Sequence, residues 1–90
     1  MEPIYEALPP DVAAEVQQLS RLVYESREHR RAVLETAGAG SPEELLERIV
    51  RAEVAEHPSY EHYLAARILG DTHELARSLM ARALKEANAQ

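Results

Sequence analysis

The chain has 90 residues, a net charge of -6 and neither cysteine, phenylalanine nor tryptophan. A chain of this length forms one small domain with a modest core, which often gains stability by self-association. The acidic balance argues against a nucleic-acid partner, because a phosphate backbone needs a clustered basic surface. The lack of cysteine excludes disulfides, thiolate catalysis and cysteine-based metal sites.

The N-terminal part predicts an extended segment over residues 1–9, followed by a single helical domain over 10–90. A first helix is predicted over 10–36, because two prolines and Asp11 precede an apolar-periodic run. Gly38 and Gly40 then end it. At about 40 Å this helix is long for so small a chain.

A second helix is predicted over 42–56. Ser41 is placed to cap its N-terminus, Pro42 suits the first helical position, and Glu44 completes a capping box. Pro58 ends this helix, because a proline disfavours helical geometry at the residue before it, here His57.

A third helix over 59–69 and a fourth over 72–87 are predicted on either side of Gly70 and Asp71. Gly70 is the expected terminator, and Asp71 with Glu74 forms a second capping box. The class is therefore all-α, a small bundle of about four helices. Because the later helices are too short to cover the first one, we expect a symmetric dimer in which the long helices pack together. The alternative is a bend in the first helix around Ser26–Arg30.

Apolar residues recur at helical spacing in every predicted helix and are assigned to the core. The third helix gathers Tyr60, Tyr63, Leu64 and Ile68, and the fourth gathers Leu75, Ala76, Leu79, Met80, Ala83, Leu84 and Ala87.

Three charged residues, Arg30, Glu53 and Arg67, fall inside these apolar faces. Because an unpaired buried charge is very costly, we expect a buried ionic network in which Glu53 lies between two guanidinium groups, near the subunit interface. Two other interpretations remain open. The arginine stems pack while their heads reach water, or Arg30 and Arg67 hold a carboxylate or phosphate ligand. A misplaced helix phase near a frayed end would remove the pattern.

The region from Glu53 to His62 carries the best metal-ligand types, namely Glu53, Glu56, His57 and Glu61. Glu53 and His57 are spaced to share one helix face, but Pro58 displaces His57. The chain contains no Glu-x-x-His pair of the kind that helical carboxylate metal sites use. We therefore expect no metal site, unless a second chain supplies further ligands.

The stretch Tyr24–Arg31, which reads YESREHRR, is locally basic. Arginine and glutamate spaced three or four residues apart indicate an exposed helix with internal ion pairs. The functional alternative is a docking patch for an acidic partner surface.

No nucleophile elbow, phosphate loop or dinucleotide fingerprint occurs, so we expect neither an enzyme nor a cofactor. No apolar run approaches the ~20 residues of a membrane span, and no signal-peptide pattern precedes the domain, which predicts a cytoplasmic protein. The function we expect is protein–protein interaction, as an adaptor, accessory subunit or regulator that also forms a homodimer. The alternative is a metal- or anion-binding bundle using Glu53–His62 with Arg30 and Arg67. A third hypothesis is an acidic inhibitor that occupies a nucleic-acid site.

Overall fold

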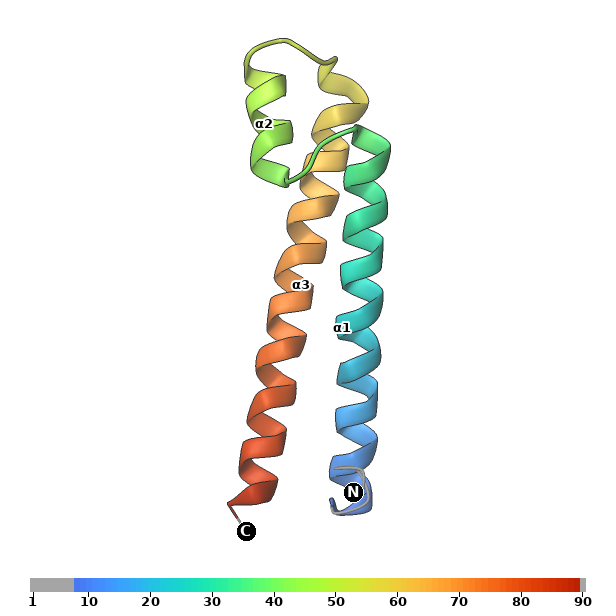
Figure 1. Ribbon diagram of the computed structural model, residues 1–90, viewed down its shortest axis with the longest axis vertical. Coiled ribbons are helices and arrows are strands. Elements are labelled where there is room, and N and C mark those ends of the chain that lie inside the picture. The colour runs from blue at the N-terminus through green and yellow to red at the C-terminus, as the bar shows by residue number, and fades with distance from the viewer. Residues whose placement is uncertain (1–7, 90) are drawn as a thin grey trace.

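The computed structural model describes residues 8–89, so the expected extended segment over 1–9 lies almost wholly outside the described residues. Within this part, three α-helices follow one another: α1 (Pro10–Ala37), α2 (Pro42–Val50) and α3 (Glu56–Asn88). α1 and α3 lie side by side and antiparallel, and α2 packs beside the N-terminal part of α3 (Figure 1). The all-α class is confirmed, but the four predicted helices are three.

α1 ends where the sequence predicts, at a glycine in the left-handed conformation. Gly38 has φ 70°, and its amide donates to the carbonyl of Glu35 at 3.0 Å. The amide of Ala39 donates to the carbonyl of Leu34, also at 3.0 Å. This pair of bonds satisfies carbonyls that a helix C-terminus otherwise leaves without partners.

The start of α2 also follows the sequence signal. The Ser41 hydroxyl accepts a hydrogen bond from the amide of Glu44 at 3.1 Å, and the Glu44 carboxylate accepts one from the amide of Gly40 at 2.7 Å. Arg48 pairs with Glu44 and donates to the carbonyl of Gly38 at 2.7 Å. These contacts fix the angle at which the chain turns from α1 into α2.

The predicted second helix over 42–56 is too long, because the chain leaves helical geometry early. Ala52 adopts φ 57°, and its amide donates to the carbonyl of Ile49 at 3.0 Å. The amide of Glu53 donates to the carbonyl of Arg48 at 2.9 Å. This is the same ending as at α1, formed by an alanine, which lacks the freedom that makes glycine the usual residue there.

The third and fourth predicted helices, 59–69 and 72–87, are a single helix of 33 residues. Gly70 does not end it, and Asp71 is an exposed residue of the helix interior rather than a cap. The side chain of Arg30 from α1 crosses this point, where a Cβ on Gly70 would lie 3.4 Å from its Nε atom. Packing against α1 outweighs the ~1 kcal/mol that glycine costs inside a helix.

Pro58 does not end the second helix as predicted, because α2 already ends at Val50, but it does mark a helix boundary. His57 has φ -104° and ψ 132°, which is extended geometry, so the regular part of α3 begins at Pro58. The residue before a proline favours this region because α-helical geometry brings it against the proline ring.

The core lies between α1 and α3, and α2 packs beside the N-terminal part of α3 (Figure 1). The buried apolar residues are Val16, Leu34, Leu45, Tyr63, Ala66 and Ala76. α3 runs along α1, so the premise that the later helices are too short to cover the first one is wrong, while the dimer itself stays a prediction (Figure 1). α1 is one continuous helix of 28 residues, and no sharp bend around Ser26–Arg30 is seen in it (Figure 1).

Candidate functional site

The predicted buried network of Arg30, Glu53 and Arg67 does not form within the chain. Glu53 follows the end of α2 and is exposed, and so is Arg67. Among residues 8–89 no ion pair joins these three side chains. The physical reason is the early end of α2, which removes Glu53 from the helix face that its spacing suggested.

Each of the two arginines instead packs against a neighbouring group. The stem of Arg30 is half-buried against Gly70 of α3. Arg67 donates a hydrogen bond to the Tyr63 hydroxyl at 2.8 Å and lies 5.8 Å from the centre of that ring. This hydrogen bond raises the pKa of Arg67. The observed arrangement agrees with arginine stems that pack while their charged heads reach water.

The four candidate metal ligands are not gathered into one site. Glu53, Glu56, His57 and Glu61 are all exposed, and only the last two touch, with 2.5 Å between Nδ1 and Oε1. A hydrogen bond from its own backbone amide, and then the contact with His57, lower the pKa of Glu61. Over residues 8–89 there is no cluster of three or more ligand side chains suited to a metal ion.

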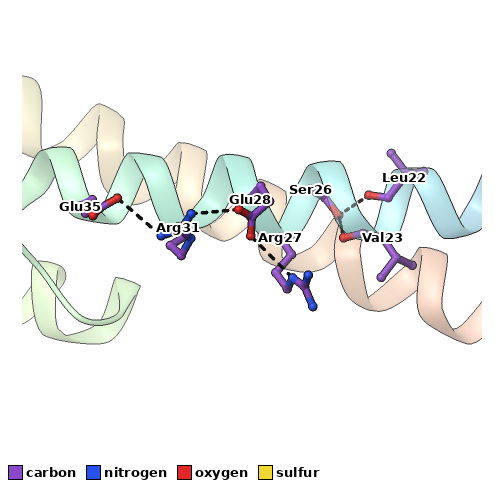
Figure 2. A network of polar contacts seen from close by, with 7 residues as sticks. All are labelled: Leu22, Val23, Ser26, Arg27, Glu28, Arg31 and Glu35. Atoms are coloured by element: carbon purple, nitrogen blue, oxygen red, sulfur yellow. Dashed lines mark hydrogen bonds and ion pairs between the residues drawn. The ribbon is translucent and has the colours of Figure 1, made fainter.

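The basic stretch of α1 is an exposed helix surface with local ion pairs (Figure 2). Arg31 lies 2.9 Å from Glu28 and 4.0 Å from Glu35, and Arg27 lies 3.8 Å from Glu28. The hydrogen bond from Arg31 lowers the pKa of Glu28. The adjacent groove of about 410 Å³ is lined by these arginines and by Glu35, so carboxylates of the same helix already balance part of its charge.

Ser26 is buried in the middle of α1, and its hydroxyl is satisfied within that helix. It donates to the carbonyl of Leu22 at 2.6 Å, and the carbonyl of Val23 lies 3.2 Å away (Figure 2). A serine that bonds back to its own helix needs no partner across the seam. This polar residue is therefore compatible with close packing and marks no ligand site.

The most unusual surface of the molecule lies on α3, on the side away from α1. Large apolar side chains there recur at helical spacing and remain 39–63% exposed. We call them the outer stripe: Tyr60, Leu64, Ile68, Leu75 and Leu79. Sequence reasoning identified all five as apolar-face residues, but it split them between two helices and assigned them to the core.

The opposite, inner face of α3 carries small residues. Ala66 is 0% exposed and Ala76 is 1% exposed, and half-buried Gly70 lies under Arg30. Small side chains let two helix backbones approach closely but bury little apolar area each. The seam between α1 and α3 thus combines small residues of α3 with the buried Tyr63, while the large residues of the outer stripe remain in contact with water.

Two further observations concern membrane-spanning helices and similar proteins. In the part of the chain that the structure describes, no helix is both long enough and apolar enough to cross a membrane. Comparison of the chain with protein-family models, with curated proteins and with solved structures finds no match.

Proposed function

We propose that this chain is a non-catalytic protein that acts through protein–protein contacts, that the outer stripe is its binding surface, and that a second copy of the chain is its first partner. The observation that carries the proposal is a row of large apolar residues along one face of one helix. Monomeric proteins scatter such residues singly, whereas an exposed apolar row, here interrupted at Asp71 and Thr72, is typical of an interaction site.

The total exposed surface supports self-association. The chain exposes 6535 Å², whereas a compact monomer of 10.1 kDa exposes about 5,300 Å². The difference of about 1,200 Å² goes with the elongated shape of the chain, 54 × 20 × 19 Å, and is comparable with the ~800 Å² that each partner contributes to an interface of standard size. A dimer through the outer stripe would bring the exposed area per chain back to the range of ordinary small proteins.

The apolar energy of the outer stripe is of the order that association requires. Full burial of one leucine or isoleucine side chain contributes about 1.5–3 kcal/mol. Four such residues lie in the outer stripe, and each of them is already partly covered in the single chain. A symmetric interface uses every one of them twice, so burial of their exposed parts contributes about 6–12 kcal/mol, which is comparable with the ~4–15 kcal/mol of entropy lost when two chains associate.

This proposal replaces the dimer through the first helix that the sequence suggested, because α3 of the same chain covers α1. The role as adaptor, accessory subunit or regulator and the cytoplasmic location remain part of the proposal. In each of these roles the pair of chains would present two identical outward surfaces of α1, related by the symmetry of the dimer.

Light scattering after size exclusion tests the proposal with two matched variants. Ile68→Asp places a charge in the outer stripe, and Val50→Asp places the same charge at an exposed valine of α2. We expect the wild type and Val50→Asp to have twice the chain mass of 10.1 kDa. Ile68→Asp should associate about 100-fold more weakly or not at all, because two carboxylates would lose water inside an apolar contact.

Circular dichroism on the same samples checks that both variants keep their helices. A wild type that remains at the mass of one chain up to ~100 μM would refute the proposal, since any association of useful strength is populated there. Equal dimerisation by all three proteins would also refute it, because the contact would then lie elsewhere.

A further inference from the structure

We infer that two copies pair through α3 in antiparallel orientation, about a two-fold axis that passes between Asp71 and Thr72. This inference rests on the proposed function, and it adds the geometry and register of the contact. The outer stripe is nearly symmetric about that point. Leu64 and Leu79 lie equally far from it in the sequence, and so do Ile68 and Leu75.

A two-fold axis at this point brings each leucine or isoleucine of the stripe opposite an apolar residue of the other copy. Ile68 of one copy lies opposite Leu75 of the other, and Leu64 lies opposite Leu79. Each of these layers therefore occurs twice, as an isologous interface requires. In each layer one copy contributes a residue that precedes the axis and the other copy a residue that follows it. The side chains therefore interdigitate as in an antiparallel coiled coil.

Charge decides between the antiparallel and the parallel arrangement. Asp71, in the middle of this face, lies next to its own copy in either arrangement and so does not distinguish them. The charged residues that do are Glu61, between Tyr60 and Leu64, and Arg82, three residues after Leu79. An antiparallel pair places Glu61 of each copy opposite Arg82 of the other. A parallel pair would place Glu61 against Glu61 and Arg82 against Arg82, and like charges across an interface suppress that pairing.

The charged residues at both ends of the stripe already have partners within the chain. The regular part of α3 begins at Pro58, so the helical register does not extend to His57. Within the single chain, Glu61 contacts His57, and Arg82 lies 3.2 Å from Glu86. All four side chains are more than half exposed, so they are free to extend the same ion pairs across the two copies.

The rest of the fold leaves the middle of this surface most open. α1 and α2 both lie beside α3, and α2 lies next to its N-terminal part (Figure 1). Ile68 and Leu75 are 63% and 61% exposed, whereas Tyr60 and Leu64 are 42% and 41% exposed. The contact from Glu61 to Arg82 spans about 30 Å at 1.5 Å rise per residue. This length fits within the 54 Å long axis of the protomer.

The absence of cysteine makes disulfide cross-linking a clean test, because every introduced thiol is the only one in its chain. We would prepare Glu61→Cys and Arg82→Cys, oxidise each alone and as an equal mixture, and count linked chains by mass spectrometry. The mixture should form a linked heterodimer. Neither variant should link to itself, because two copies of position 61 lie about 30 Å apart in the antiparallel pair.

Asp71→Cys serves as the positive control, since position 71 lies beside the proposed axis and should link to its own copy. Self-linkage of Glu61→Cys would show a parallel pair and overturn the inference, while the proposed function would stand. Dimeric masses without linkage of the mixture would place the contact in another register and also overturn it. Monomeric masses for the unoxidised proteins would remove the proposed function itself.

Discussion

The two faces of α3 differ in how well their apolar side chains are covered. The inner face buries Tyr63, Ala66 and Ala76, whereas the outer face exposes Ile68 at 63% and Leu75 at 61%. A helix usually buries its large apolar residues, because they gain most from leaving water. The difference supports the proposal that α3 has a second partner, another copy of the chain, on its outer face.

A buried charge gives the largest expected effect. Ala66→Asp should lower the free energy of unfolding by about 3–5 kcal/mol, because its carboxylate would be unpaired in the seam. Ile68→Asp, on the outer face, should change the stability of the single chain by less than ~1 kcal/mol and act on association instead. Urea unfolding at a concentration where Ile68→Asp is monomeric measures both. Equal losses of stability would contradict the distinction between the faces.

A pair of neighbouring residues sharpens the same comparison. Ala76 is 1% exposed, so Ala76→Leu should overpack the seam and cost about 1–3 kcal/mol of unfolding free energy. Leu75→Ala removes a side chain that is 61% exposed, so it should cost the single chain little while it weakens the dimer. Thermal unfolding of the single chain, with light scattering on the same variants, separates the two effects. A larger loss of single-chain stability for Leu75→Ala would show that Leu75 is a core residue.

Gly70 tests how tightly the inner face is filled. A Cβ there would lie 3.4 Å from Arg30 Nε and 3.7 Å from its Cδ, which are ordinary contacts. Gly70→Ala should therefore raise the free energy of unfolding by about 0.5–1 kcal/mol through helix propensity. Gly38→Ala is the control and should lower it by ~1 kcal/mol, because φ is 70° at that residue. Denaturant unfolding distinguishes the signs, and a loss at position 70 would show that the seam has no room.

Charge exchange at the ends of the outer stripe gives the smallest effect. Glu61→Arg and Arg82→Glu should each weaken the dimer by a few tenths to about 1 kcal/mol per contact, because exposed ion pairs contribute little. The double variant should recover most of the loss, since it restores opposite charges in the antiparallel register. Dissociation constants from sedimentation equilibrium at low salt measure this coupling. Additive losses in the double variant would contradict the pairing of these two positions.

Local signals allowed part of this fold to be predicted from the sequence. The glycine at position 38 and the capping box of Ser41 and Glu44 act through hydrogen bonds between residues close in the chain, so their pattern suffices. Two other boundaries depended on the rest of the molecule. Ala52 takes the left-handed conformation, which an alanine in the sequence does not predict. Gly70 stays helical because Arg30 and α1 pack over it.

The errors in the site follow from those two boundaries. Because α2 ends early, Glu53 leaves the apolar face, and the predicted ionic network loses its carboxylate. Because Gly70 does not divide α3, the apolar residues before and after it form one stripe. Helical periodicity identified these residues, but which of the two faces of α3 is covered depends on the long-range pairing with α1. Helical periodicity identifies an apolar face, but it does not predict which helix packs against that face.

Sedimentation equilibrium of the unmodified protein over a wide concentration range tests the central claim most directly. If the outer stripe binds a second copy, the mass should approach twice 10.1 kDa and fall towards 10.1 kDa on dilution. Ile68→Asp, run beside it, should keep the mass of one chain throughout. A wild-type mass of 10.1 kDa at every concentration would contradict the claim and leave the outer stripe as an exposed surface without a partner of its own kind.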